Sequence, residues 1–272
     1  MTLSPTTHWR VNPSIVALFA AGAFAPSNGS RAAEIRGAPE VHADAPDPGH
    51  RQQQDGALGV TSRARAPKRL AGDVTVGLQT GARGLSSAPN GDISGRLGLG
   101  WGLVAGVDVA KSPDGAQDYR PGASVLWQFA GRDGGPVSVA VGASFRAEGF
   151  IEPEGEAEGI FAATVRQGAA ELSLNAVGGA EPDGREGDVE GALALGYWLL
   201  PALLVGAEGR ERAGFGTKAG GFGDRRGDFA AAMAQARVRQ FLLTGLVGAR
   251  HDQEAGMGRT SFAALLRVGC GF

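Results

Sequence analysis

From Leu70 to the last residue, apolar side chains alternate with polar or small ones at every second position. Between Val137 and Glu148, for example, the odd positions carry Val, Ala and Phe, and the even positions carry Ser, Ala, Gly, Arg and Glu. Successive side chains on a β-strand point to opposite faces, so the pattern predicts strands with one apolar and one polar face. The 46 glycines among 272 residues argue against a helical bundle, because each Gly inside a helix costs about 1 kcal/mol relative to Ala.

The alternating segments are long and regular in length. A tilted strand that crosses a bilayer needs about 9–11 residues, whereas strands of globular proteins have about 5–6. About twelve segments fit the longer class. They are expected at 73–83, 92–100, 103–111, 122–130, 136–148, 156–165, 169–178, 188–198, 203–212, 226–236, 240–250 and 259–272. One uncharged stretch, 191–207, has the alternative of a membrane helix, but Pro201 and three glycines inside it favour a hairpin.

The connectors between these segments alternate in length. Short ones are expected near 101, 132–135, 166–168, 199–202 and 238–239, and longer ones near 84–91, 111–121, 149–155, 179–187, 213–225 and 251–258. All prolines after residue 70 fall in a connector or on the first residue of a segment, as expected of a residue that cannot donate to a strand ladder. Short turns at one end and long loops at the other are typical of membrane barrels.

The final segment, Ser261 to Phe272, places Phe262, Leu266 and Phe272 on one face and ends in an aromatic residue. With this ending, the chain from about residue 70 onward resembles the bacterial outer-membrane β-barrel superfamily, including its porin-like members. The resemblance implies an all-β fold: a transmembrane antiparallel up-and-down β-barrel of about twelve strands, with short periplasmic turns and longer extracellular loops. It also implies a place in the cell outer membrane, contact with its lipid, and recognition by the barrel assembly machinery through the strand that ends in Phe272.

The first seventy residues lack this alternation. Residues 1–33 combine Arg10, an apolar centre and small residues, which predicts a signal peptide, with a short anchor or buried helix as alternatives. Residues 34–70 are rich in Pro, Gln and scattered charge, which predicts a flexible periplasmic tail or a segment tucked into a lumen. The barrel is expected over 71–272.

If the apolar face contacts lipid, the opposite face lines the interior and carries charges of both signs. The lumen-lining candidates are Arg83, Arg96, Asp108, Arg146, Glu148, Glu171, Asp188, Glu190, Glu208, Arg210, Arg212, Arg250 and Arg267, and Asp228 is placed on the same face. Such charges either pair and seal the barrel or border a narrow polar path, and a barrel of this size lies between filled and open types.

The leading hypothesis is a narrow passive pore for small polar solutes, or a general envelope component, without enzymatic activity, cofactor or metal. A net charge of −2 gives no basic field for nucleic acid. Two alternatives remain open. One is a lipid-acting hydrolase that pairs His251 with Ser261. The other is a non-conducting surface or adhesion scaffold that binds through residues 213–225.

Overall fold

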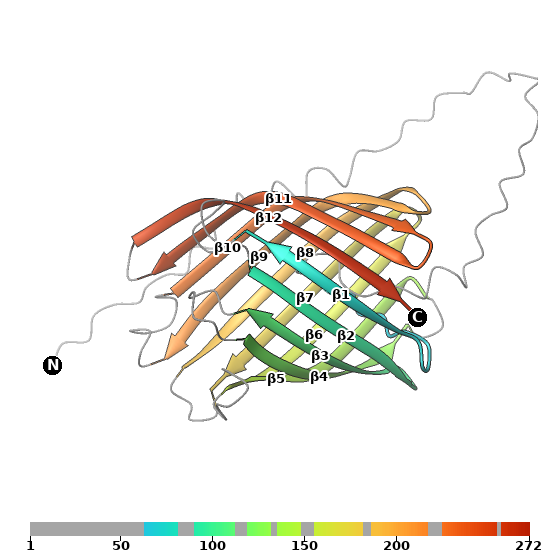
Figure 1. Ribbon diagram of the computed structural model, residues 1–272, viewed down its shortest axis with the longest axis horizontal. Helices are drawn as coiled ribbons and strands as arrows, with labels where there is room; N and C mark the ends of the chain where they lie inside the picture. The colour runs from blue at the N-terminus through green and yellow to red at the C-terminus, as the bar shows by residue number, and fades with distance from the viewer. Residues whose placement is uncertain are drawn as a thin grey trace, which may run out of the picture. The chain divides into compact units, whose positions relative to one another are not determined.

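Twelve antiparallel strands close on themselves into a single barrel in the computed structural model (Figure 1). The structure describes residues 63–80, 90–111, 119–131, 135–147, 155–181, 186–216, 225–254 and 257–272. Each strand pairs with the next one along the chain, and the last pairs with the first. The predicted all-β up-and-down barrel is therefore confirmed.

The strands lie close to the segments expected from the alternation. They are β1 (Gly72–Gln79), β2 (Asn90–Gly100), β3 (Leu103–Lys111), β4 (Tyr119–Ala130), β5 (Val137–Ala147), β6 (Gly155–Gln167), β7 (Ala170–Ala180), β8 (Glu186–Leu200), β9 (Leu203–Gly216), β10 (Arg225–Val238), β11 (Phe241–Glu254) and β12 (Met257–Gly271). The hairpin at Pro201 is present, so the helical alternative for 191–207 is wrong. No helix among the described residues is long and apolar enough to cross a membrane.

The long connector expected at 251–258 is wrong, because β11 continues to Glu254 and β12 begins at Met257. The ladder pairs His251 with Thr260 and Asp252 with Arg259 beyond the apolar part of the strands. At the other end of the barrel the turns are tight. Trp101 and Gly102 both have positive φ, of 51° and 80°, as a two-residue type I′ hairpin turn requires.

The barrel closes between β1 and β12. The backbones of Gly72 and Phe272 exchange two hydrogen bonds of 3.0 Å, and the ladder runs on to Gln79 opposite Leu265. The Phe272 ring lies against Gly72, where a Cβ would be 2.7 Å from a ring carbon. Closure leaves no unpaired strand edge in this sheet.

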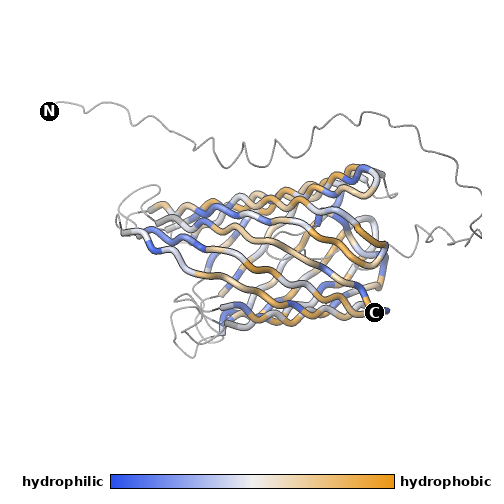
Figure 2. Tube along the Cα trace, turned by 90° about the horizontal axis from the view of Figure 1, so that it is seen from above, coloured by the Kyte–Doolittle hydropathy of each residue, from blue (hydrophilic) through white to orange (hydrophobic). Residues whose placement is uncertain are grey.

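Apolar side chains cover the outside of the barrel. Val74, Val76 and Leu78 on β1 are all exposed, as are Leu266 and Val268 on β12. Figure 2 shows hydrophobic positions recurring along every strand, with more hydrophilic ones toward the end opposite Phe272. An apolar surface of this extent is far larger than a soluble monomer presents to water.

The inner face is mixed. Between β8 and β12 it carries an apolar cluster of Ala194, Leu204, Ala231, Met233, Leu246 and Leu265, with Trp198 and Phe229 packed against it. These two aromatic residues point inward. Other aromatics near the strand ends, such as Trp101, Tyr197 and Phe262, are exposed on the outside.

Candidate functional site in the barrel lumen

Arginine–carboxylate pairs line the wall from mid-height to the long-connector end of the lumen. Arg146 lies 3.3 Å from Asp108, Arg267 lies 3.5 Å from Asp92, and Arg210 lies 3.7 Å from Glu190. Further pairs join Arg212 to Asp188, and Arg250 to Asp252 at 2.8 Å. Nearer the Phe272 end, the Arg96 guanidinium donates two hydrogen bonds, of 2.5 and 3.3 Å, to the Asp73 carboxylate. The pairs involve eight of the twelve strands and connect residues of opposite charge.

Two of these pairs reach across an intervening strand, and a glycine makes this geometry available. Gly77 on β1 pairs with Asp92 on one side and with Arg267 on the other. A Cβ on Gly77 would collide with the Asp92 carboxylate, so the carboxylate lies flat over the glycine on its way to Arg267. The side chains therefore follow the wall.

The same arrangement recurs on β4. Gly122 pairs with Asp108 on β3 and with Arg146 on β5, and its Cβ position would be 2.5 Å from an Asp108 oxygen. On β7, Gly179 leaves room for the Glu156 carboxylate and pairs with Asp188. The acid–glycine–arginine row thus occurs twice in the described lumen wall, at Gly77 and Gly122, and it explains why these inward positions lack a side chain.

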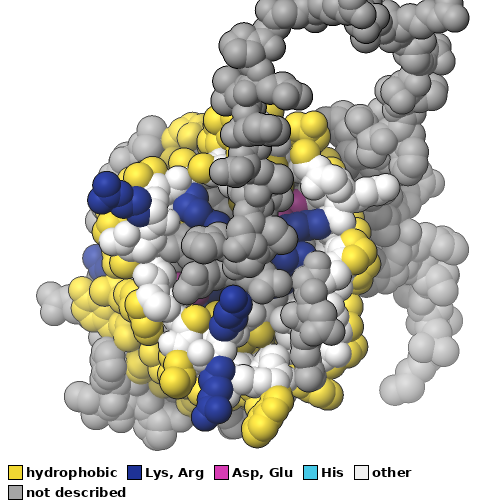
Figure 3. Space-filling model, turned by 90° about the vertical axis from the view of Figure 1, so that its right-hand side faces the viewer, with side chains coloured by type: hydrophobic (Ala, Val, Ile, Leu, Met, Phe, Trp, Pro, Cys, Tyr) yellow, Lys and Arg dark blue, Asp and Glu magenta, His cyan; other side chains and the backbone are white. Residues whose placement is uncertain are grey.

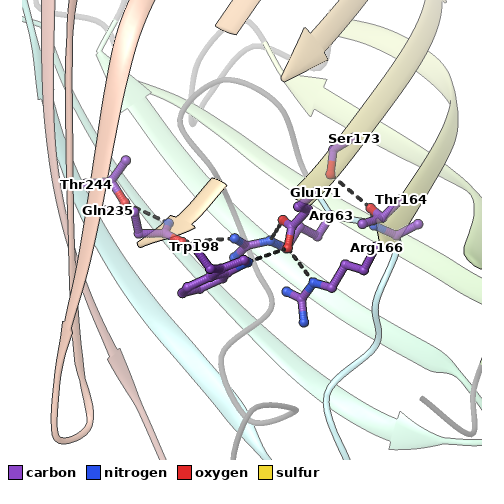
Figure 4. A network of polar contacts seen from close by, with 9 residues as sticks. Arg63, Thr164, Arg166, Glu171, Ser173, Trp198, Gln235 and Thr244 are labelled. Carbon is purple, nitrogen blue, oxygen red and sulfur yellow. Dashed lines mark hydrogen bonds and ion pairs between the residues drawn. The ribbon is translucent and has the colours of Figure 1, made fainter. Parts of the chain in front are cut away.

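The short-turn end of the lumen is built around Glu171, the second residue of β7. Its carboxylate accepts hydrogen bonds from the Nε of Arg63, from the Nε of Arg166, and from the indole nitrogen of Trp198 at 3.3 Å (Figure 4). The guanidinium carbons of Arg63 and Arg166 lie 5.7 and 5.6 Å from the Trp198 ring centroid. The side chains of Arg63 and Glu171 are 0% and 1% exposed.

Arg63 also contacts the wall three strands further on. Its Nη2 donates to the Oε1 of Gln235 on β10 at 3.1 Å, and the Gln235 amide donates to Thr244 on β11 at 2.9 Å (Figure 4). This arginine precedes β1 by nine residues, in the stretch 34–70 that the sequence analysis assigned to a tail or to a segment tucked into a lumen. Residues 34–62 of that stretch, and the expected signal peptide at 1–33, lie outside the described residues.

The residues that follow Arg63 are bound to the wall as well. The backbone N–H of Ala64 donates to Thr164 Oγ1 at 3.0 Å, and that of Ala66 donates to Gln128 Oε1 at 2.8 Å. Ala64 is buried with Ala140 and Ala162. Arg65 donates to the carbonyl of Gly135 at 3.2 Å. We call residues Arg63–Pro67 the mouth segment.

Cationic side chains predominate at this end. Figure 3 looks at the short-turn end and shows several Lys and Arg side chains on this face, with hydrophobic side chains around its outer edge. The described cations there are Arg63, Arg65, Lys68, Arg69, Arg96, Arg166, Arg237 and Arg239, against the carboxylates of Asp73 and Glu171. By contrast, the long-connector end carries both signs in similar numbers.

The structure places most of the predicted lumen residues on the inner face. Arg83 and Glu148 lie outside the described residues. The others, which alternate with outward apolar residues, are Arg96, Asp108, Arg146, Glu171, Asp188, Glu190, Glu208, Arg210, Arg212, Arg250 and Arg267. Asp228 is a correction: it pairs with Glu211 and His251 on the outer face, while Phe229 points inward.

Sequence reasoning missed the residues around Glu171. The pairing of Arg166 with Glu171 across a two-residue turn was within reach, because these residues oppose each other in the hairpin. Arg63 and Gln235 carried no signal, because only the closed barrel brings them together.

The expected pairing of His251 with Ser261 is wrong. His251 Nδ1 lies 2.9 Å from Thr260 Oγ1 on the outside of the barrel, and Ser261 pairs with Arg250 on the opposite face. Within the described ranges there is no group of three or more His, Cys, Asp or Glu side chains able to hold a metal ion. Residues 213–216 of the proposed adhesion loop belong to β9, and 217–224 are not among the described residues.

No protein-family profile and no curated protein sequence matches this chain. Among solved structures, the NanC porin superposes with a TM-score of 0.50 at 10% identity, over 74% of this chain and 98% of that one. The chain has a porin-like barrel fold. The KdgM porin gives 0.48 at 10% identity over the same shares of the two chains, and LpxR from Salmonella typhimurium gives 0.44 at 8%, over 73% of this chain and 99% of that one. At these identities the likeness extends to the fold alone.

Proposed function

We propose that the protein resides in the outer membrane and forms a narrow passive pore for small polar solutes. The observation that carries this proposal is the arrangement of the lumen charges. Asp92 and Asp108 lie flat over Gly77 and Gly122, so that each ion pair follows the wall instead of bridging the interior. An apolar exterior around this charged interior suits a bilayer outside and water inside.

The size of the barrel supports the same proposal. Eight strands give an interior just wide enough for side chains to fill, and about 16–18 strands leave an aqueous channel. Twelve strands fall between these sizes. Passage then depends on how far side chains extend from the wall, and glycines at inward positions keep that extension small. Because arginines and carboxylates are interleaved, both ends of a zwitterionic or neutral polar solute find a partner.

Assembly in the outer membrane is part of this proposal. Phe272 is exposed on the outside, and its backbone closes the seam with Gly72. We expect the β12 strand and its terminal ring to be the part that the barrel assembly machinery binds. Phe272→Ala should lower the amount of heat-modifiable barrel in outer-membrane fractions while leaving refolding in detergent almost unchanged. Equal loss in both would assign Phe272 to stability instead.

Single-channel recording of the refolded full chain tests the pore directly. Only preparations whose unboiled gel mobility shows a closed barrel are used. Arg146→Ala and Glu190→Ala remove one lumen charge of each sign, and we expect them to shift the ion selectivity in opposite directions. Glu211→Ala, on the outer face, is the matched control and should leave selectivity unchanged. Silence from every folded barrel, including one with Arg63 replaced, would overturn the pore.

A further inference from the structure

We propose that the mouth segment, Arg63–Pro67, is a plug that closes the short-turn end of the pore, and that Glu171, Gln235 and Trp198 form the guanidinium-binding site that holds it. The inference rests on the proposed pore and adds a gate to it. The ligand of this site is an extended, arginine-bearing peptide, which the chain itself supplies.

The contacts of the mouth segment show that it spans the opening. Gln128, which binds the Ala66 N–H, belongs to β4, and Gln235, which binds Arg63, belongs to β10. These strands are six steps apart in the closed order of twelve, so they lie on opposite walls. Between them, Thr164 on β6 binds the Ala64 N–H and Glu171 on β7 binds Arg63. A segment attached to both walls obstructs the opening between them.

The wall is shaped to receive the mouth segment. Ala140 and Ala162 are small inward residues, and Ala64 is buried against them. At Gly98 a Cβ would lie 2.7 Å from the Pro67 carbonyl oxygen, so any larger residue on β2 would push the segment away. Backbone donors of the segment meet side-chain acceptors of the wall, which satisfies groups that burial otherwise leaves without water.

The Arg63 site has the composition of a specific guanidinium receptor. A carboxylate, an amide oxygen and the face of an indole ring surround the side chain. Arginine suits such a site because its planar guanidinium forms directed hydrogen bonds and stacks on aromatic rings. Burial of a charge is costly unless it is paired and hydrogen-bonded, so these contacts decide whether Arg63 stays inside.

Glu171 is also suited to release the plug. Its second oxygen is held by Arg166 and Trp198 of the wall itself. When Arg63 leaves for water, the Glu171 carboxylate still has a charged partner, so the barrel keeps its structure with the plug out. Arg166 thus keeps Glu171 paired in both states, and Arg63 can bind or leave without exposing an unpaired buried carboxylate.

The first experiment compares conductance of the full chain with that of Arg63→Ala and Glu171→Gln. Each variant removes one side of the latch, and we expect the open fraction to rise about tenfold, as a shift of the plug population. Arg69→Ala is the matched control, since it removes an exposed cation two residues beyond the segment. A wild type that conducts as much as both variants would overturn the plug and leave the pore intact.

Thiol labelling measures the plug without any current. With Cys270→Ser as background, Ala64→Cys puts a thiol at a position that is 2% exposed. A water-soluble maleimide should label it slowly, and about tenfold faster when Arg63→Ala or Glu171→Gln is added, because labelling follows the open population. Fast labelling in the variants with no current would refute the pore and keep the plug. Equal labelling in all of them would refute the plug.

A peptide supplied from outside tests the binding site itself. The hexapeptide Ser-Arg-Ala-Arg-Ala-Pro, which copies residues 62–67, is added to Arg63→Ala barrels in the bilayer. We expect it to reduce the current in a dose-dependent way, and a peptide with Ala at the first arginine to have no effect. Equal block by the two peptides would show that general positive charge, and not the guanidinium site, causes closure, and would overturn the proposed receptor.

Discussion

The two ends of the lumen treat charge in opposite ways. At the long-connector end, five arginines of the wall lie beside a carboxylate, and Gly77 and Gly122 let two of these pairs lie flat. At the short-turn end, cations outnumber carboxylates, and one of them, Arg63, comes from outside the sheet to reach Glu171. Ion pairs that lie along the wall keep the lumen polar and leave its centre free. Arg63 belongs instead to the mouth segment, which crosses the lumen and occupies it.

Burial separates the two ends energetically. The Arg63 and Glu171 side chains are fully enclosed, while those of Arg146 and Asp108 are 39% and 26% exposed. Removing one partner of a buried ion pair leaves the other charge without water and costs much stability. Removing one partner of an exposed pair leaves a solvated charge and costs little. The following variants are arranged by the effect that this difference predicts.

The largest effect is expected for Glu171→Leu. It removes the shared acceptor of Arg63, Arg166 and Trp198, and should lower the free energy of unfolding by about 3 kcal/mol, the lower end for a broken buried pair because Arg63 can move to water. Urea unfolding in detergent micelles measures the change. Adding Arg63→Ala to this variant should then cost almost nothing. A second loss as large as the first would show that Arg63 stabilises the barrel independently of Glu171.

A smaller effect is expected when a wall pair loses its glycine. Gly77→Val occupies the place of the Asp92 carboxylate and separates it from Arg267. We expect a loss of about 2 kcal/mol, because the substitution separates a partly buried ion pair and leaves each charge without its partner. Gly191→Val is the control, as no atom lies within 4 Å of its Cβ position. If both valines destabilise equally, β-strand geometry and not the ion pair is responsible.

The most exposed ion pair should contribute least to the free energy of unfolding among the lumen pairs. Arg250 and Asp252 lie on the same strand with side chains 37% and 36% exposed. Arg250→Ala should therefore cost about 0.5 kcal/mol, and the difference from wild type should shrink in high salt. The same urea titration at two salt concentrations measures this. An effect that is independent of salt would show that Arg250 acts through packing.

The smallest effect on stability is expected for a residue on the outer face of the barrel. His251 contacts Thr260 outside the barrel, and His251→Ala should change the free energy of unfolding by less than about 0.5 kcal/mol. Conductance should remain at the wild-type level. A lipid product formed by the wild type and lost in this variant would show an enzymatic role for His251 in which Ser261, on the opposite face, is not its partner.

Most of the barrel could be predicted from the sequence because its strands are governed by a local rule. Alternation, proline positions and turn residues are all properties of neighbours in the chain. The alternation rule failed where apolar and polar residues no longer alternate. In β10, alanines occupy both faces from Ala230 to Ala232, so alternation did not reveal that Asp228 points outward and Phe229 inward. Beyond His251 the apolar side chains end while the backbone ladder continues.

The candidate site was harder to predict, since it depends on ring closure. Charges such as Arg146 and Glu190 could be assigned to the inner face by counting along a strand. The acid–glycine–arginine rows need the register of three strands, and the surroundings of Arg63 combine residues from β7, β8 and β10. No spacing in the linear sequence encodes such a set.

The inward orientation of Trp198 has a spectroscopic consequence. Trp101 and Trp127 lie on the outer surface, where lipid or detergent shields their indole rings. Trp198 is enclosed by two guanidinium groups and a carboxylate at the end of the barrel. Its emission wavelength and its quenching by aqueous iodide are therefore an optical signal of the state of the mouth, built into the native chain and readable without a label.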